Sequence, residues 1–306
     1  MEFRNLRAFV EVVRQRGFTA AAKTLAATQS TVSKSVRQLE EEVGAPLLDR
    51  LGQGPRLTEA GEIVYRRALR LLGERDDLVA ELDALKGLKR GVLRLGLPVL
   101  GSGVMFAPLF AQYRQLYPDI EIQLVEHGSA RLEEILRLGE IDFAASLLPI
   151  EDDFEWLEVR REPLMALLPK DHPLAAKSLL SISDLRDNPL ILFESGFALN
   201  RVIVGACRRA GFEPKVAARS SQIDFIVELA NAGLGIAFLP EMLDERRPPG
   251  GPVSVALDEP ATDWHLALVW RRGAFLSDAA RAWLDLLKAS RGLSGPALWN
   301  PGVKTT

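Results

Sequence analysis

FTAAAKTLAATQSTVSKSVRQLEEEVGAPLLDRLGQGPRLT, residues 18–58, is the stretch that decides the fold of the amino-terminal part of the chain. The small residues at 19–25 predict a short helix that another helix can approach closely. After a turn at Ala26 and Ala27, Thr28 is placed to cap a longer helix. One face of the longer helix is apolar, at the spacing of a helix packed on a core, and consists of Val32, Val36, Leu39 and Val43.

The opposite face of the longer helix is polar. Its side chains can hydrogen-bond base edges or phosphates in a major groove. The alternative is an ordinary amphipathic helix whose polar face is merely solvated. The polar face consists of Gln29, Ser30, Ser33, Lys34 and Arg37.

The segments on either side of this helix favour nucleic-acid binding. Upstream, an apolar stripe over 6–13 predicts a scaffold helix that ends at Gly17. Downstream, Gly44 and Pro46 end the longer helix, and 47–57 predicts a small hairpin with a Gly-Gln-Gly-Pro tip and one Arg on each arm. Thr58 then caps another helix. The predicted order is helix, helix, recognition helix, wing and long helix.

This order and its residues resemble the LysR-type transcriptional regulators. Ser30 stands where that family usually has Pro, Gln53 where its wing has a basic residue, and Leu48 where Phe is usual. The first two positions are expected DNA contacts, so they bear on the preferred base sequence more than on binding itself. The segments that carry the resemblance are Phe18–Ala22, Gln29–Ser33, Leu39–Glu40 and Leu57–Gly61.

The resemblance implies a winged helix-turn-helix DNA-binding domain over residues 1–58. This head contains nine Lys or Arg and six Asp or Glu, so it is basic although the whole chain has a net charge of -3. Affinity for DNA should fall as salt rises, because the cations displace counterions from phosphates. The expected DNA contacts are Thr19, Gln29, Ser30, Thr31, Ser33, Lys34, Arg37, Arg50 and Arg56.

Residues 59–90 are expected to form a linker helix that runs to about Leu85 and ends in a hinge. A helix between two domains must cover an apolar seam, either within its own chain or against a helix of a second subunit. In the resembling family this helix dimerises the heads, which implies two half-sites in an interrupted palindrome. The seam consists of Val64, Ala68, Leu71, Leu78, Leu82 and Leu85, is interrupted by Arg75, and is widened by Leu72 and Val79.

Beyond the hinge, alternating strands and helices predict an α/β domain with parallel strands. The first unit consists of strands 92–97, 120–125 and 141–147 and helices 106–116 and 131–138. The second consists of strands 164–168, 190–193, 215–219 and 236–239 and helices 200–210 and 223–231. The chain is expected to return to the first unit through strand 265–270 and helix 277–288.

Two such units resemble the two-lobed effector domain of the same family, which has the architecture of periplasmic solute-binding proteins. The sequence motifs GEID at 139–142 and AGLGIAFLP at 232–240 carry this resemblance. The expected effector-binding domain covers 91–290, with lobe I at about 91–163 and 267–290 and lobe II at about 164–266. The tail 291–306 is rich in Gly and Pro and resembles nothing in the family.

The loops that follow the strands predict an effector pocket, because ligands of open α/β sheets bind beyond the carboxyl ends of the strands. A loop that opens a helix also offers free N–H groups, which favour an organic anion. For each serine alone, a helix cap without a ligand is the alternative. The expected effector-binding residues are Gly101, Ser102, Gly103, Ser129, Ser146, Ser195, Gly196 and Phe197.

Two other classes of protein account for less of the sequence. An enzyme is disfavoured because no Gly-x-Ser-x-Gly pattern occurs and the histidines lack metal-ligand spacing, so no catalytic residue, metal or cofactor is expected. A solute-binding protein explains only the α/β half. The start lacks a secretory signal and no apolar run reaches a membrane span, so we expect a cytoplasmic protein without membrane contact. The single cysteine, Cys207, excludes an intramolecular disulfide.

The resemblance therefore implies a regulator whose promoter activity is controlled by a small molecule bound between the lobes. The expected partners are double-stranded promoter DNA, further copies of the chain and RNA polymerase. Dimers of this family commonly pair into tetramers through their effector domains.

Overall fold

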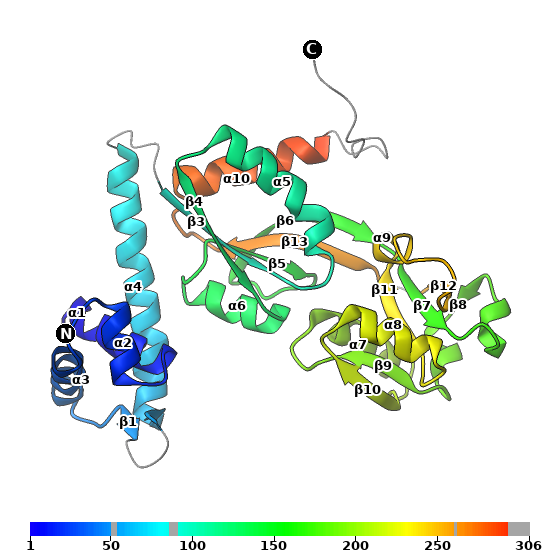
Figure 1. The fold of residues 1–306 in the computed structure, drawn as a ribbon, viewed down its shortest axis with the longest axis horizontal. Helices are drawn as coiled ribbons and strands as arrows, with labels where there is room; N and C mark the ends of the chain where they lie inside the picture. The colour runs from blue at the N-terminus through cyan, green and yellow to red at the C-terminus, as the bar shows by residue number, and fades with distance from the viewer. Residues whose placement is uncertain (50–53, 86–90, 260–261, 293–306) are drawn as a thin grey trace.

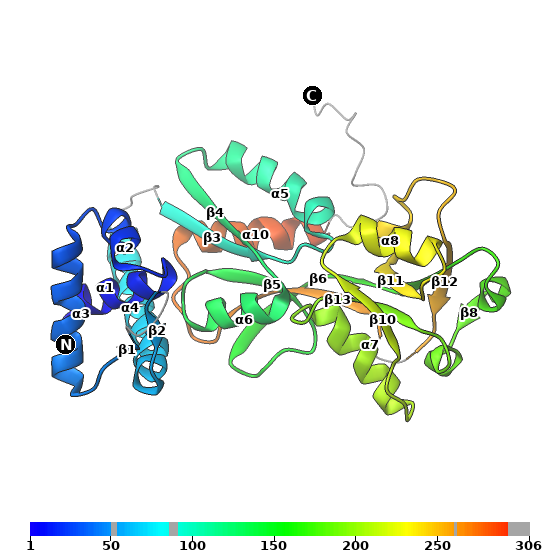
Figure 2. The same cartoon turned by 60° about the horizontal axis from the view of Figure 1, so that its bottom comes forward.

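The computed structural model describes residues 1–49, 54–85, 91–259 and 262–292. The head lies at one end of the molecule, lobe I in the middle and lobe II at the other end (Figure 1). The long helix α4 stands between the head's other helices and lobe I. A view turned by 60° shows the same order (Figure 2). The predicted hinge residues 86–90 and tail residues 293–306 lie outside the described residues.

Three helices form the head around an apolar core. The inward faces of all three helices meet, and Phe9, Val36 and Leu39 are completely buried there. Phe9 also meets the ring of Tyr65 edge to face, with ring centroids 6.2 Å apart. The helices are α1 (Phe3–Arg14), α2 (Phe18–Thr24) and α3 (Gln29–Val43).

Local signals fix both ends of α3 as predicted. The Thr28 hydroxyl accepts a hydrogen bond from the Thr31 backbone N–H at 3.2 Å, which satisfies one free donor of the first turn. Gly44 ends the helix in the left-handed conformation with φ 75°, which glycine adopts without steric cost. The wing is a two-stranded antiparallel sheet of β1 (Leu48–Asp49) and β2 (Arg56–Leu57). Residues 50–53, including Arg50 and the departure at Gln53, lie outside the described residues.

Helix α4 (Glu59–Leu85) divides its predicted seam between two environments. Ala68 and Leu72 are buried in the head's own core, together with Leu69. Leu71 and Leu82 are about half exposed, at 47% and 49%. The core of the head therefore covers Ala68 and Leu72 from within the same chain, whereas Leu71 and Leu82 remain on the surface.

Lobe I is built on a five-stranded sheet with the strand order β4-β3-β5-β13-β6. β3 pairs in parallel with β4 and β5, while β13 runs antiparallel to β5 and β6. α5 and α10 cover one face and α6 the other (Figure 1). The strands are β3 (Gly91–Leu97), β4 (Ile120–Glu126), β5 (Phe143–Leu147), β6 (Phe154–Glu162) and β13 (Trp264–Arg271). The helices are α5 (Ser102–Leu116), α6 (Ser129–Arg137) and α10 (Asp278–Gly292).

Lobe II contains a four-stranded sheet and a two-stranded parallel sheet, linked by a bridge between Leu190 and Ile236. The larger sheet has the order β11-β7-β12-β8. The strands are β7 (Leu164–Leu168), β8 (Leu179–Leu180), β9 (Leu190–Phe193), β10 (Val216–Ser220), β11 (Ala237–Pro240) and β12 (Val253–Leu257). The helices are α7 (Ala198–Arg209), α8 (Ile223–Asn231) and α9 (Glu241–Asp244), with 3-10 turns at Pro173–Ala176 and Ile182–Leu185.

The structure corrects the predicted α/β pattern in several places. Strands β6, β8 and β12 had no counterpart in the prediction, and α5 begins at Ser102 rather than at 106. The chain also returns to the sheet of lobe I before 267, since Trp264 already pairs with Glu162. In the part of the chain that the structure describes, no helix combines the length and apolar character needed to cross a membrane.

Gly61 provides a test of how α4 packs on the head. A Cβ atom there would lie 2.0 Å from the backbone oxygen of Leu47, whereas a Cβ at Gly205 in α7 would meet only the end of Arg209 at 3.6 Å. Gly61→Ala should therefore lower the free energy of unfolding by about 1–3 kcal/mol. Gly205→Ala should raise it by up to about 1 kcal/mol through helix propensity. Urea unfolding followed by circular dichroism measures both, and a stabilised Gly61→Ala protein would contradict this packing.

Candidate nucleic-acid interface and contact between the lobes

The apolar face of α3 fixes the direction of its polar face. Val32, Val36 and Leu39 are buried against the head, so the opposite side of the helix points outward. α3 lies on the side of the head away from the effector domain in both views (Figures 1 and 2). The outward side of α3 is therefore open to a large ligand.

Most of the predicted DNA contacts lie on this open side of the head. Thr19 on α2 is exposed, Ser33 is half-buried, and Arg50 lies outside the described residues. The guanidinium of Arg37 bonds Glu41 at 3.1 Å, with both side chains largely in solvent. The exposed side chains of α3 and the wing are Gln29, Ser30, Thr31, Lys34, Arg37 and Arg56.

Hydrogen bonds hold the wing against α3. The Glu40 carboxylate, whose role the sequence did not indicate, accepts hydrogen bonds from the backbone N–H groups of Leu47 at 2.9 Å and Leu48 at 3.3 Å. The Thr58 hydroxyl donates to the Pro46 carbonyl at 2.7 Å. An open hollow of about 620 Å³ lies between α3 and the wing. This hollow is lined by Arg37, Glu40, Pro46, Leu48, Asp49 and Thr58.

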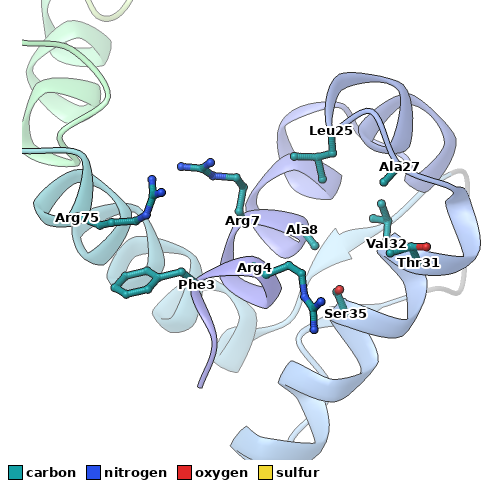
Figure 3. A pocket seen from close by; sticks show the side chains of 10 residues that line it. All are labelled: Phe3, Arg4, Arg7, Ala8, Leu25, Ala27, Thr31, Val32, Ser35 and Arg75. Carbon is teal, nitrogen blue, oxygen red and sulfur yellow. The ribbon is translucent and has the colours of Figure 1, made fainter. Parts of the chain in front are cut away.

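A second hollow, of about 420 Å³, lies on the head between α1, α3 and α4 (Figure 3). Arg7 and Arg75 both bond Asp76, at 3.4 Å and 2.6 Å, so their positive charges are partly compensated. Thr31 lines this hollow and bonds Thr28, which places it at the edge of the polar face of α3. The lining residues are Phe3, Arg4, Arg7, Ala8, Leu25, Ala27, Thr31, Val32, Ser35 and Arg75.

In the effector domain, two of the predicted loops meet across the lobes. The Ala130 backbone N–H, just after Ser129 at the start of α6, donates to the Gly196 carbonyl of lobe II at 3.1 Å. A Cβ at Gly128 would lie 2.8 Å from the same carbonyl oxygen, so glycine permits this close approach. The structure thus brings the loop after β4 against the loop after β9.

The predicted serines of lobe I are buried, and Ser195 of lobe II is exposed. Ser129 is only 4% exposed, and the Ser102 hydroxyl donates to the Pro98 carbonyl within its own loop. The Ser146 hydroxyl is completely buried and donates to Glu133 at 2.5 Å. These hydroxyl donors are engaged by the protein, which leaves Ser102 and Ser146 only acceptor capacity toward a ligand.

The remaining predicted pocket residues lie in different surroundings. Gly101 has φ 86° and faces Met242 and Trp264, because a Cβ there would lie 2.8 Å and 3.0 Å from their side chains. Gly103 and Gly196 are exposed. Phe197 stacks on Phe193 with ring centroids 5.1 Å apart and forms an aromatic wall beside the loop.

Sequence reasoning missed the charged residues that connect the lobes. Glu133 is 7% exposed on the packed face of α6, and Arg201 of lobe II approaches its carboxylate at 3.6 Å. Arg201 also donates to the carbonyls of Leu147 at 3.0 Å and Pro149 at 3.2 Å. One signal was present in the sequence: Glu133 occupies a position of an amphipathic helix that is buried together with its neighbour Leu132.

Other reactive groups of the chain give no sign of a chemical site. Burial raises the pKa of Cys207 to about 11, which keeps its thiol protonated and unreactive at neutral pH. Among the described residues, no group of three or more His, Cys, Asp or Glu side chains is arranged to hold a metal ion.

Comparison with known proteins matches one family to the head and another to the effector domain. The family described as "Bacterial regulatory helix-turn-helix protein, lysR family" matches residues 3–62, and the "LysR substrate binding domain" family matches residues 86–291. The chain belongs to the LysR family of transcriptional regulators. The predicted family and fold class are thereby confirmed. Members of this family are transcriptional regulators and not enzymes.

Individual relatives match this LysR-type regulator over nearly its whole length. It is 37% identical to the uncharacterized HTH-type transcriptional regulator YwbI of Bacillus subtilis (strain 168), over 98% of each chain. It is 34% identical to the HTH-type transcriptional regulator BudR of Raoultella terrigena, over 89% of this chain and 95% of BudR. A full-length OxyR variant from Pseudomonas aeruginosa has a similar structure, with a TM-score of 0.72, 26% identity and coverage of 96% of each chain.

The cap of α3 yields a prediction about the first turn of this helix. Thr28→Ala removes the acceptor of the Thr31 N–H, and this should lower the stability of the head by about 1 kcal/mol. Amide hydrogen exchange at 29–31 should become faster. Thr24→Ala is the matched control, because its hydroxyl bonds only the Ala20 carbonyl within α2. Unchanged exchange in the Thr28 variant would contradict this role of the cap.

Proposed function

We propose that this LysR-type regulator binds a specific promoter sequence by placing α3 in the major groove and the wing on the neighbouring backbone. The observation that carries this proposal is the open polar face of α3 beside a wing that Glu40 holds in place. A major groove admits one helix, and the amide of Gln29 and the hydroxyl of Ser33 suit base edges. Residues 1–58 are the proposed DNA-binding domain.

The basic side chains beside this face would contact phosphates. Lys34, Arg37 and Arg56 are exposed, and the Glu41 partner of Arg37 is itself in solvent. An exposed ion pair contributes little, so Arg37 can exchange Glu41 for a phosphate at small cost. Arg50 is proposed as a further contact from the sequence alone.

We also propose a homodimer that forms through the exposed second half of α4. Leu71, Leu78, Val79 and Leu82 are 43–56% exposed and would be covered by the same helix of a second subunit. A dimer would present two recognition helices to two half-sites separated by about one or more turns of DNA. Tetramers formed through the effector domains, and contact with RNA polymerase, extend this proposal. A promoter-bound regulator of this kind would work in the cytoplasm.

The LysR substrate binding domain binds small-molecule effectors, and we propose that the site in this chain lies between the lobes. The contact between Ala130 and Gly196 supports this place, because a ligand there would touch both lobes. The start of α6 and the guanidinium of Arg201 would favour an organic anion. Ser102, Ser129, Ser146 and Ser195 are the proposed polar lining.

Selection of genomic DNA fragments by the full-length protein, at several salt concentrations, tests the proposed function. An interrupted palindrome that stays enriched at moderate salt would support it. Enrichment no higher than that of random fragments, with a folded protein, would overturn it.

The salt dependence of DNA binding tests whether Lys34 contacts a phosphate. Lys34→Ala should reduce the slope of log affinity against log salt by about 0.9 and weaken binding to all sequences alike, because one counterion fewer is released. Fluorescence anisotropy with a selected fragment measures the slope. Lys288→Ala, on α10 of the effector domain, is the matched control. An unchanged slope for Lys34→Ala would remove it from the interface.

The effector pocket can be tested with a panel of small mono- and dicarboxylates. At least one should raise the melting temperature of the wild-type protein, and Ser102→Ala combined with Ser195→Ala should reduce that shift. Affinity for DNA without the carboxylate should be the same in both proteins. An equal shift in the double variant would place the ligand elsewhere.

A further inference from the structure

Lobe I docks on the head and on α4 of the same chain through the turn that follows α6. Leu138 is 5% exposed and belongs to the same buried cluster as Leu69 and Leu72 of α4. The two backbones also touch, since a Cβ at Gly73 would lie 3.4 Å from the Cα of Gly139. The head and the effector domain thus share an apolar contact.

Charged groups hold this contact in place. Glu140 pairs with Arg14 at the end of α1 at 2.8 Å, and Arg271 pairs with Glu74 of α4 at 3.4 Å. The second oxygen of Glu140 is buried without a hydrogen-bond partner among the described residues, so the carboxylate depends on Arg14. Burial lowers the pKa of Arg14, but Glu140, together with Tyr65 and Glu11, outweighs this effect and the net shift is upward. Separating the pair would leave a partly buried carboxylate without its cation, which is costly.

The other end of the same helix lies where the two lobes meet. The first turn of α6 contacts the Gly196 carbonyl through Ala130, and Glu133 joins Ser146 and Arg201 one turn later. α6 has nine residues and is therefore about 13 Å long. One short helix thus reaches from the proposed effector site between the lobes to the turn that contacts the head.

The packing of α6 makes it move as a unit. Leu132, Ile135 and Leu136 are buried in one cluster with the neighbouring strands. Close-packed helices shift as rigid bodies between discrete arrangements, because the core resists gradual deformation. A shift of the backbone at Gly128, just before α6, therefore also shifts Leu138, just after α6.

We propose that α6 is the element through which the lobes control the head, by docking or releasing the 138–140 turn on α1 and α4. This proposal rests on the proposed function. Docking fixes the head and linker before DNA binds, so release lowers the affinity for the operator. The docked lobe leaves α3 open. Its Leu138 packs in the cluster of Leu69 and Leu72 and leaves the exposed residues of α4 uncovered, so docking is compatible with pairing of two linker helices.

A methyl group added where the lobes meet, here called the wedge, tests this proposal without a known effector. In Gly128→Ala the added methyl group meets the Gly196 backbone of lobe II at 2.8 Å and must displace α6. Arg201→Ala loosens the same end of α6 by a different route and serves if the wedge disturbs folding. Gly205→Ala is the control, since it adds the same methyl group to α7 without a close contact.

The docking site is tested by exchange of charges in the full-length protein. Arg14→Glu and Glu140→Arg should each release the turn, and the two together should restore it with the net charge of the wild type. One readout is amide hydrogen exchange at 65–73 and 138–140. The other is anisotropy with a selected operator fragment, for which release should weaken binding about fivefold or more.

The expected result is non-additive. Gly128→Ala should speed exchange at 138–140 and weaken operator binding in the wild type, and it should do neither in the Arg14→Glu background, where the turn is already released. Equal effects of the wedge in both backgrounds, or no effect on 138–140, would overturn the role of α6. Loss of discrimination between the selected fragment and random DNA in the wild type would instead overturn the proposed function, while the exchange data would still test the docking.

Discussion

Helix α4 must cover apolar surface on more than one side, and the rest of the structure depends on how it does so. Ala68 and Leu72 complete the core of the head, and Leu138 of lobe I closes the same cluster from the other direction. Without the helix the head would lose part of its core, and lobe I would lose the apolar part of its contact with the head. Leu71 and Leu82 are left exposed. One helix therefore sets the position of the head and supplies the surface through which a second subunit could bind.

The same arrangement explains how chemistry at the lobes could reach DNA over a distance. Gly196 and Arg201 of lobe II contact the first two turns of α6, and the turn after α6 contacts α1 and α4. α1 packs directly on α3 in the core of the head. Each step is a packed contact rather than a flexible connection, so two arrangements of the lobes can correspond to two arrangements of the head. The coupling must act in both directions, because binding free energies are reciprocal.

Local signals made most of the head and many elements of the effector domain predictable from sequence. The cap at Thr28 and the left-handed Gly44 act within one turn of chain, and the structure has both where the sequence placed them. Strand β12 was missed because its partners β7 and β8 lie far away in sequence. For the same reason, sequence patterns did not show that Glu133 meets Arg201 or that the GEID motif contacts the head. The sequence left open what covers the seam of α4, because periodicity identifies an apolar face but not its partner.

Amide hydrogen exchange of the full-length protein, with and without a selected operator fragment, tests the central claim most directly. Residues 29–37 should be protected by the DNA itself. If α6 couples the two ends of the chain, exchange at 128–133, where the lobes meet, must also change on DNA binding. Protection confined to α3 and the wing, with 128–133 and 138–140 unchanged, would contradict the account and leave the head and the effector domain as independent parts.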